Sequence, residues 1–80
     1  MINDNKMKLF RKTDTTLVYI ASTQFAKEIM GNNYHKVLLY IHVKRDTGFI
    51  IIYEDNDTNK VVPIDLNNQE YILKCAEENR

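Results

Sequence analysis

The sequence predicts an α+β fold: an antiparallel sheet of about five strands with two short amphipathic helices, in the order β-β-α-β-β-β-α. Three observations support this prediction. Turn-forming residues recur at intervals of roughly ten residues, short runs rich in β-branched and aromatic residues lie between them, and two segments space their apolar residues as a helix does. A chain of 80 residues has room for one compact domain, residues 1–80.

The first half of the chain predicts a hairpin followed by a helix. Strand-like segments at 7–12 and 15–21 are separated by the turn "TDT". A helix is expected next, because Ser22 or Thr23 can cap its first turn and Gly31 lies where it would end. Its apolar face comprises Phe25, Ala26, Ile29 and Met30.

The next two strands are predicted at 35–45 and 49–55, joined by the loop "DTG". Gly48 can adopt the positive φ that closes a three-residue hairpin loop with a bulge. This loop would place Ile41 opposite Tyr53 and so determine which residues share a face of the sheet. The face away from the predicted core would hold Leu38, Tyr40, His42, Lys44, Ile50, Ile52 and Glu54.

The chain is expected to end with a strand and a helix. The segment 60–65 resembles a strand, and Pro63 places it at a sheet edge or marks its end, because proline has no N–H to donate. The helix is predicted over 66–80, with Asn67 as the N-cap and Glu70 three residues later.

The second face of the predicted sheet is unusually apolar. An antiparallel sheet with one solvated face should carry polar residues there, whereas about half of this face is apolar. Three arrangements would account for it: the helices divide between the two faces, the sheet curls over itself, or the face binds a partner. The candidate partner-binding residues are Tyr40, His42, Lys44, Ile50, Ile52 and Glu54.

Net charge and cysteine content exclude several classes of protein. Eleven Lys and Arg residues balance eleven Asp and Glu residues, so net charge draws the chain neither to nucleic acid nor to an anionic membrane. Cys75 is the only cysteine, which excludes an internal disulfide and is typical of a reducing compartment. The start "MINDNKMK" has no apolar signal segment, and no apolar run approaches the ~20 residues of a membrane span. We therefore expect a cytoplasmic protein.

The sequence offers little for catalysis. Cys75 lies on the apolar stripe of the last predicted helix, where we expect a core side chain, since a nucleophile would need a lowered pKa. Gly31 and Gly48 are the only glycines, so no phosphate-binding loop of the G-x-x-x-x-G-K type is present. We predict that the protein is not an enzyme and that it has no catalytic or cofactor-binding residues.

One stretch, "YEDNDTNKVV", raises the question of a metal site. Asp55, Asp57 and Asn59 have the spacing of the first three ligands of an EF-hand calcium loop. Lys60 and Leu66 occupy the positions that require Gly and a bidentate Glu, so we expect a hairpin turn instead. The soft ligands His35, His42 and Cys75 lack the close spacing of zinc sites. No metal site is predicted.

Two functional hypotheses remain. The first is a small non-enzymatic protein-binding module that covers a surface of another protein or forms a homodimer. Asn, Ile and Lys supply 26 of the 80 residues, a bias we associate with AT-rich genomes and their phages, so an inhibitor of a host defence protein is one form of this hypothesis. The alternative is a DNA- or RNA-binding regulator that uses Lys8, Arg11, Lys12, Tyr40, His42 and Lys44.

Overall fold

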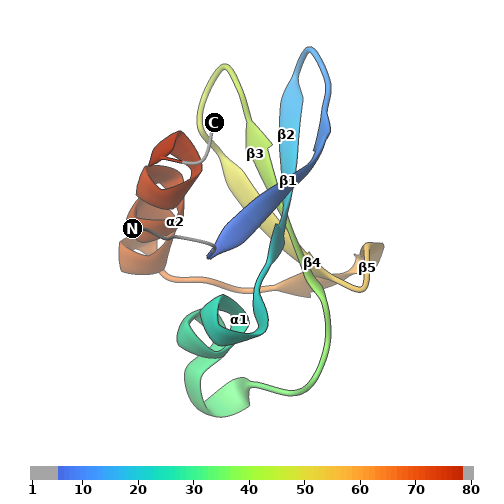
Figure 1. Ribbon diagram of the computed structural model, residues 1–80, viewed down its shortest axis with the longest axis vertical. Coiled ribbons are helices and arrows are strands. Elements are labelled where there is room, and N and C mark those ends of the chain that lie inside the picture. Colours follow the sequence, from blue (N-terminus) through green and yellow to red (C-terminus); the bar gives the residue numbers. More distant parts are fainter. Residues whose placement is uncertain (1–5, 79–80) are drawn as a thin grey trace.

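The computed structural model describes residues 6–78 and confirms the predicted α+β class (Figure 1). Five antiparallel strands and two helices follow one another in the predicted order, with a short 3-10 turn after the first helix. The elements are β1 (Met7–Lys12), β2 (Thr16–Ala21), α1 (Thr23–Met30), η1 (Gly31–Asn33), β3 (Leu39–Lys44), β4 (Ile50–Glu54), β5 (Asp57–Val62) and α2 (Leu66–Glu78).

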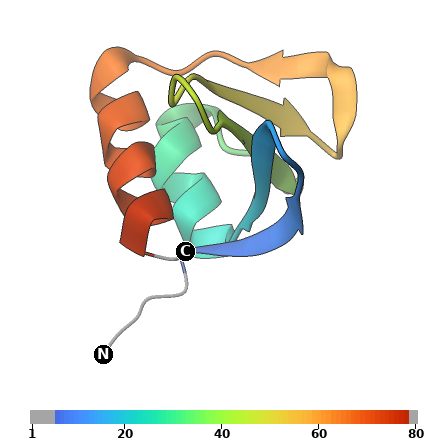
Figure 2. The same ribbon diagram turned by 90° about the horizontal axis from the view of Figure 1, so that it is seen from above.

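The sheet is a meander in which each strand pairs with the next one along the chain, from β1 to β5. Both helices lie on the same side of this sheet (Figure 2). The hypothesis that the helices divide between the two faces is therefore wrong. The main core lies between the helices and one face of the sheet, and its fully buried members include Tyr19, Phe25, Leu39, Ile41, Ile52 and Ile72.

The two helices also pack against each other. The rings of Phe25 in α1 and Tyr71 in α2 meet edge to face, with their centroids 5.7 Å apart. The hydroxyl of Tyr71 donates to Glu28 Oε1 of α1 at 3.1 Å and accepts from Lys6 Nζ, just before β1. Tyr71 thus joins the start of β1 to both helices. Within residues 6–78, no helix combines the length and apolar character needed to cross a bilayer.

Local sequence signals explain where α1 and β5 begin and end. The Ser22 side chain accepts a hydrogen bond from the backbone N–H of Phe25 at 3.1 Å, so of the two predicted candidates Ser22 is the N-cap and Thr23 is the first helical residue. Gly31 follows the helix with φ of +58°, a conformation that glycine adopts without strain. β5 is an edge strand that ends immediately before Pro63, as predicted.

The β3–β4 hairpin differs from the prediction by one residue. Gly48 has the expected positive φ, +74°, but the loop has four residues because Lys44 N–H bonds to Phe49 O. Ile41 consequently pairs with Ile52 and not with Tyr53. A one-residue shift exchanges the two faces of a strand, so Ile50 and Ile52 point into the core.

The "YEDNDTNKVV" stretch forms the β4–β5 hairpin. Asp55 and Asn56 both have positive φ, 55° and 58°, the geometry of a type I′ two-residue turn that matches strand twist. Glu54 pairs with Asp57 across it, and Asp57 Oδ1 accepts from the Asn59 N–H at 3.0 Å. The predicted turn is confirmed, and β5 begins three residues earlier than the predicted 60–65.

The N-cap of α2 also differs from the prediction. Asp65 Oδ1 accepts a hydrogen bond from the Asn68 N–H at 2.8 Å, and Asp65 O accepts from the Gln69 N–H at 3.0 Å. Asp65 is therefore the cap, and Asn67 lies within the first turn. An aspartate here is additionally favoured by the positive end of the helix dipole.

The register places the neighbouring residues Ile51 and Ile52 on opposite faces of the sheet, with different degrees of burial. Ile52 is 0% exposed within the main core, whereas Ile51 is half-buried on the opposite face. We expect Ile52→Ala to lower the free energy of unfolding by about 2–5 kcal/mol, and Ile51→Ala to lower it by about 1 kcal/mol. Urea denaturation measures both. A larger loss at Ile51 would contradict the four-residue loop.

The two candidate caps of α2 can be separated in the same way. Asp65→Ala should lower the free energy of unfolding by about 1 kcal/mol, because the Asn68 N–H loses its acceptor. Asn67 lies two residues later and is exposed. Asn67→Ala should therefore change the free energy of unfolding by no more than about 0.5 kcal/mol. If Asn67→Ala lowered the free energy of unfolding more than Asp65→Ala, Asn67 would be the N-cap, as the sequence predicts.

Candidate functional site

The sheet face turned away from the helices is the candidate functional site, and we call it the open face. Alternation along each strand places every second residue there. Cross-strand pairing aligns Lys8, Ile20, Tyr40, Tyr53 and Val61 in one row across all five strands. A second row comprises Arg11, Val18, His42 and Ile51. Phe10, Thr16 and Lys44 also lie on the open face.

Aromatic rings pack against one another across the strands of the open face. Phe10 meets the Tyr40 ring edge to face with centroids 5.5 Å apart, and His42 meets the Tyr53 ring at 4.7 Å. Phe10 reaches this face because β1 carries an irregularity between Leu9 and Arg11. Such pairs fix ring orientation, so the face presents a preformed aromatic surface.

The open face has a buried layer of its own. Val18 is only 2% exposed although both helices lie on the other side of the sheet. Its cross-strand partners are Arg11 and His42, whose side chains flank it. Around this buried centre, Phe10 and Val61 remain 50% and 55% exposed. The face therefore combines an ordered apolar centre with exposed apolar side chains.

The charges on the open face have one sign. Lys8, Arg11 and Lys44 are its charged side chains, and all three are exposed. The Arg11 guanidinium lies 5.9 Å from the centre of the Phe10 ring, within the range of a cation–π contact. No acidic residue occurs among the residues that the register assigns to this face.

His42 lies at the centre of the open face and is held neutral by its surroundings. Burial, and secondarily the positive charge of Arg11, lowers the pKa of His42 below its ordinary value. Its Nε2 atom is buried and has no hydrogen-bond partner in the described part of the chain. His42 thus contributes a flat, uncharged ring to the surface.

The structure places only part of the predicted partner-binding set on one face. Tyr40, His42 and Lys44 lie together on the open face. Ile50 and Ile52 do not: they are 4% and 0% exposed in the main core, because the loop is one residue longer than predicted. Glu54, the sixth residue of the set, also lies away from the open face.

Glu54 pairs with Leu39, which lies on the helix side of the sheet, and Glu54 binds His35 there. Most residues of the nucleic-acid hypothesis do lie on one face. Lys8 and Arg11 share the open face with Tyr40, His42 and Lys44, whereas Lys12 pairs with Leu17 on the helix side.

Sequence reasoning missed several open-face residues. A three-residue loop would place Ile51 and Tyr53 on the core face, whereas the four-residue loop places both on the open face. Phe10 depends on the irregularity in β1, for which the sequence gives no turn or glycine signal. Ile20 and Val61 follow from alternation once the strand order is known.

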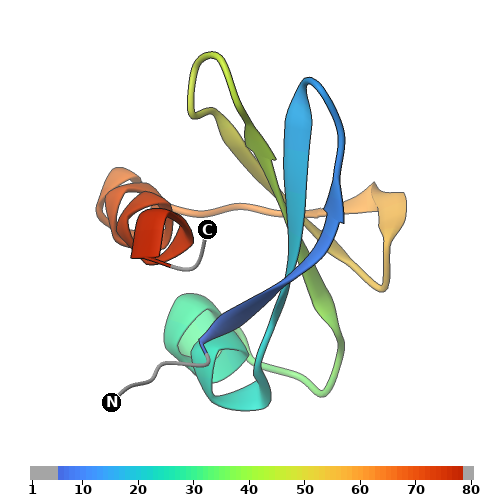
Figure 3. The same cartoon turned by 45° about the horizontal axis from the view of Figure 1, so that its top comes forward.

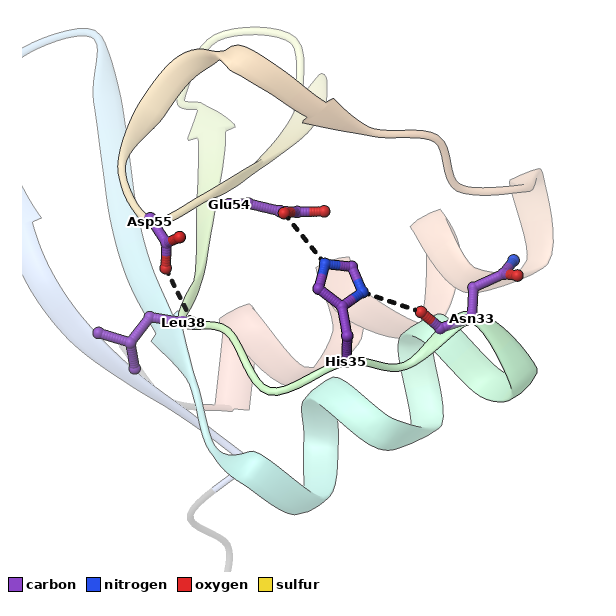
Figure 4. Close-up of polar contacts among 5 residues, drawn as sticks. All are labelled: Asn33, His35, Leu38, Glu54 and Asp55. Carbon is purple, nitrogen blue, oxygen red and sulfur yellow. Dashed lines mark hydrogen bonds and ion pairs between the residues drawn. The ribbon is translucent and has the colours of Figure 1, made fainter.

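His35 lies between two hydrogen-bond acceptors away from the open face (Figure 4). Its Nε2 lies 3.1 Å from Glu54 Oε1, and its Nδ1 lies 3.1 Å from the backbone oxygen of Asn33. Both neighbours are acceptors, so only the doubly protonated ring donates to both. The Asn33 carbonyl, and then Glu54, accordingly raises the pKa of His35.

The His35 contact ties the connection between α1 and β3 to the end of β4. Close by, Leu38 N–H donates to Asp55 Oδ1 at 3.4 Å, and the Asp55 N–H donates to Leu38 O at 2.8 Å. The backbone bond continues the β3–β4 ladder beyond the strand ends, and Figure 4 shows the side-chain bond beside it. Together, these contacts position the α1–β3 connection against the end of β4.

The described residues contain no cluster of side chains suited to a metal ion. Over residues 6–78, no three side chains of His, Cys, Asp or Glu come together in a way that could hold a metal ion. Cys75 is 4% exposed in the core, as expected, and burial is the main cause that raises the pKa of its thiol.

Comparisons with protein-family models, with curated proteins and with solved structures find no match for this chain.

The His35 contact should make stability depend on pH. A histidine whose pKa is raised on folding adds stability below its unfolded pKa of about 6.5, and this contribution disappears as pH rises through the folded pKa. The melting temperature of His35→Ala should therefore fall further below that of the unaltered protein near pH 5.5 than near pH 8.5. Glu54→Gln should reduce this difference. A deficit that is the same at both pH values would contradict the contact.

Proposed function

We propose that this chain is a small non-enzymatic protein-binding module that acts by covering a surface of another protein. The observation that carries the proposal is the open face, an ordered aromatic and aliphatic sheet surface that neither helix covers. Monomeric proteins rarely leave large contiguous apolar patches in water, so such a face favours a binding role.

The charges of the open face indicate the chemistry of the partner. Lys8, Arg11 and Lys44 are exposed and no acid lies among the paired residues of this face. A complementary partner surface would have an apolar centre bordered by Asp and Glu side chains. Basic side chains at the rim would steer the approach, while the apolar centre would supply affinity.

The dimensions of the domain suit this mode of action. Its extents are 34 × 32 × 22 Å, and a standard protein interface buries roughly 800 Å² on each partner, an area on the scale of one side of this domain. A domain of this size can block a site on a larger protein without any chemistry of its own. Inhibition by occlusion, including inhibition of a host defence protein, is the form of the proposal that we favour.

Binding of single-stranded DNA or RNA is the second candidate. It is favoured by one observation: Lys8, Arg11, Tyr40, His42 and Lys44 share the open face. Bases stack on the flat faces of aromatic rings beside basic side chains. The aliphatic share of the face gives the protein partner precedence, because Val18, Ile20, Ile51 and Val61 offer bases no stacking surface.

Phe10 and Phe49 provide a matched pair of variants for the test. Phe10 is 50% exposed on the open face, and Phe49 is 56% exposed in the β3–β4 loop. Proteins captured from the native host are identified, and their affinity for the purified variants is then measured by calorimetry. Phe10→Ala should weaken binding by about 2 kcal/mol, roughly thirtyfold, whereas Phe49→Ala should leave it unchanged.

Cross-linking identifies where the captured partner is bound. Cross-links from Lys8 and Lys44 to an acidic, apolar patch of the partner would support the proposal. Equal affinities of the two Phe variants would overturn it. So would tight oligonucleotide binding that falls steeply with salt and is lost in Lys8→Glu, the result expected of the second candidate. Sedimentation of the purified chain shows whether the open face binds a second copy, in which case Phe10→Ala should yield monomers.

A further inference from the structure

A groove lies on the helix side of the sheet, at the end opposite α1. The hairpin tips of β1–β2 and β3–β4 extend past α2 in two different views (Figures 1 and 3). The uncovered space between them and α2 is a cavity of about 370 Å³. This volume lies within the range of small-molecule sites.

The floor of the groove is apolar. Leu17 and Val43 contribute from the sheet, Leu73 and Ala76 from α2, and Leu9 from the edge strand β1. Leu9 is 41% exposed and Leu17 is half-buried, so apolar surface remains open to a ligand. Gly48 closes the loop side of the groove near α2, since a Cβ there would make an ordinary van der Waals contact with Leu73 Cδ2 at 3.5 Å.

Cations border this apolar floor. Lys12, Lys44 and Arg45 line the groove, and Glu77 is the acidic residue among its lining residues. In the described chain none of these three cations has a carboxylate within ion-pair distance, since the ion pair found there joins His35 and Glu54. The Arg45 Nη1 donates to the Thr13 carbonyl at 3.0 Å, which holds the guanidinium between the two hairpins.

From this arrangement we propose that the groove binds a small anionic amphiphile, a molecule with a carboxylate or phosphate head and a short apolar body. The apolar body would lie on Leu17, Val43 and Leu73. The head would lie beside Lys12 and Arg45, neither of which forms an ion pair within residues 6–78. A guanidinium can bind either head through two parallel hydrogen bonds.

The groove and the open face lie on opposite sides of the sheet and share one residue, Lys44, which is paired on the open face and also lines the groove. Because the variants that test the groove leave Lys44 unchanged, each proposal can fail without the other. Loss of the groove ligand would leave protein capture by the open face unaffected. Conversely, the groove does not depend on the identity of any protein partner.

The test compares ligands that share an octyl tail and differ in their heads: octanoate, octyl phosphate, octanol and octyltrimethylammonium. Amide shifts in ¹H–¹⁵N spectra report binding below the micelle-forming concentration. Octanoate or octyl phosphate should give saturable shifts at Arg45, Gly48 and Leu73, and comparison of the two identifies the preferred head. The cationic analogue should bind at least about tenfold more weakly.

Three variants complete the design. Leu9→Trp fills the groove from an exposed position on the edge strand and should abolish binding. Lys12→Glu should weaken the anionic ligands about tenfold, whereas Lys60→Glu, an exposed strand lysine on β5, is the matched control and should have no effect. The absence of saturable shifts, equal binding of all four heads, or shifts confined to the open face would overturn the proposal.

Discussion

The side-to-side alternation of strand residues is the constraint on which the rest of this structure depends. In the described part of the chain, two helices pack on the sheet, and both lie on one side of it. Tyr19, Ile41 and Ile52 therefore pack under helices, while their neighbours along the same strands face the other way. The open face and the groove both follow from this distribution, one where no helix lies and the other where α2 stops short of the hairpin tips.

Signals that act within a few residues made most of the fold predictable. Ser22, Gly31, Gly48 and Pro63 each have the backbone role that their chemistry suggests, because caps and turns depend on neighbours in sequence. The register of β4 was not predictable in the same way. A positive φ at Gly48 is compatible with a loop of three or four residues, and long-range packing of residues such as Ile52 decides between them.

The candidate site was predictable to the extent that it depends on a single strand. Tyr40 and His42 share a face by alternation along β3, whatever β3 pairs with, and their placement together was correct. Tyr53 and Phe10 depend on pairing between strands and on the irregularity in β1, which no local pattern encodes. The side on which the helices pack is likewise a tertiary property, because the amphipathic stripe of α2 fits either face in outline.

The meander topology has a consequence for how the chain acquires its structure during synthesis. Each strand pairs with its sequence neighbour, so hairpins can form as the chain leaves the ribosome, with α1 the sole long insertion between paired strands of the described sheet. The buried residues Ile72, Cys75 and Ala76 of α2 are synthesised after every strand of the described sheet. Until α2 packs, apolar side chains on both faces of the sheet are exposed, as in an aggregation-prone folding intermediate. Packing of this thirteen-residue helix buries the helix-side residues and leaves the open face exposed.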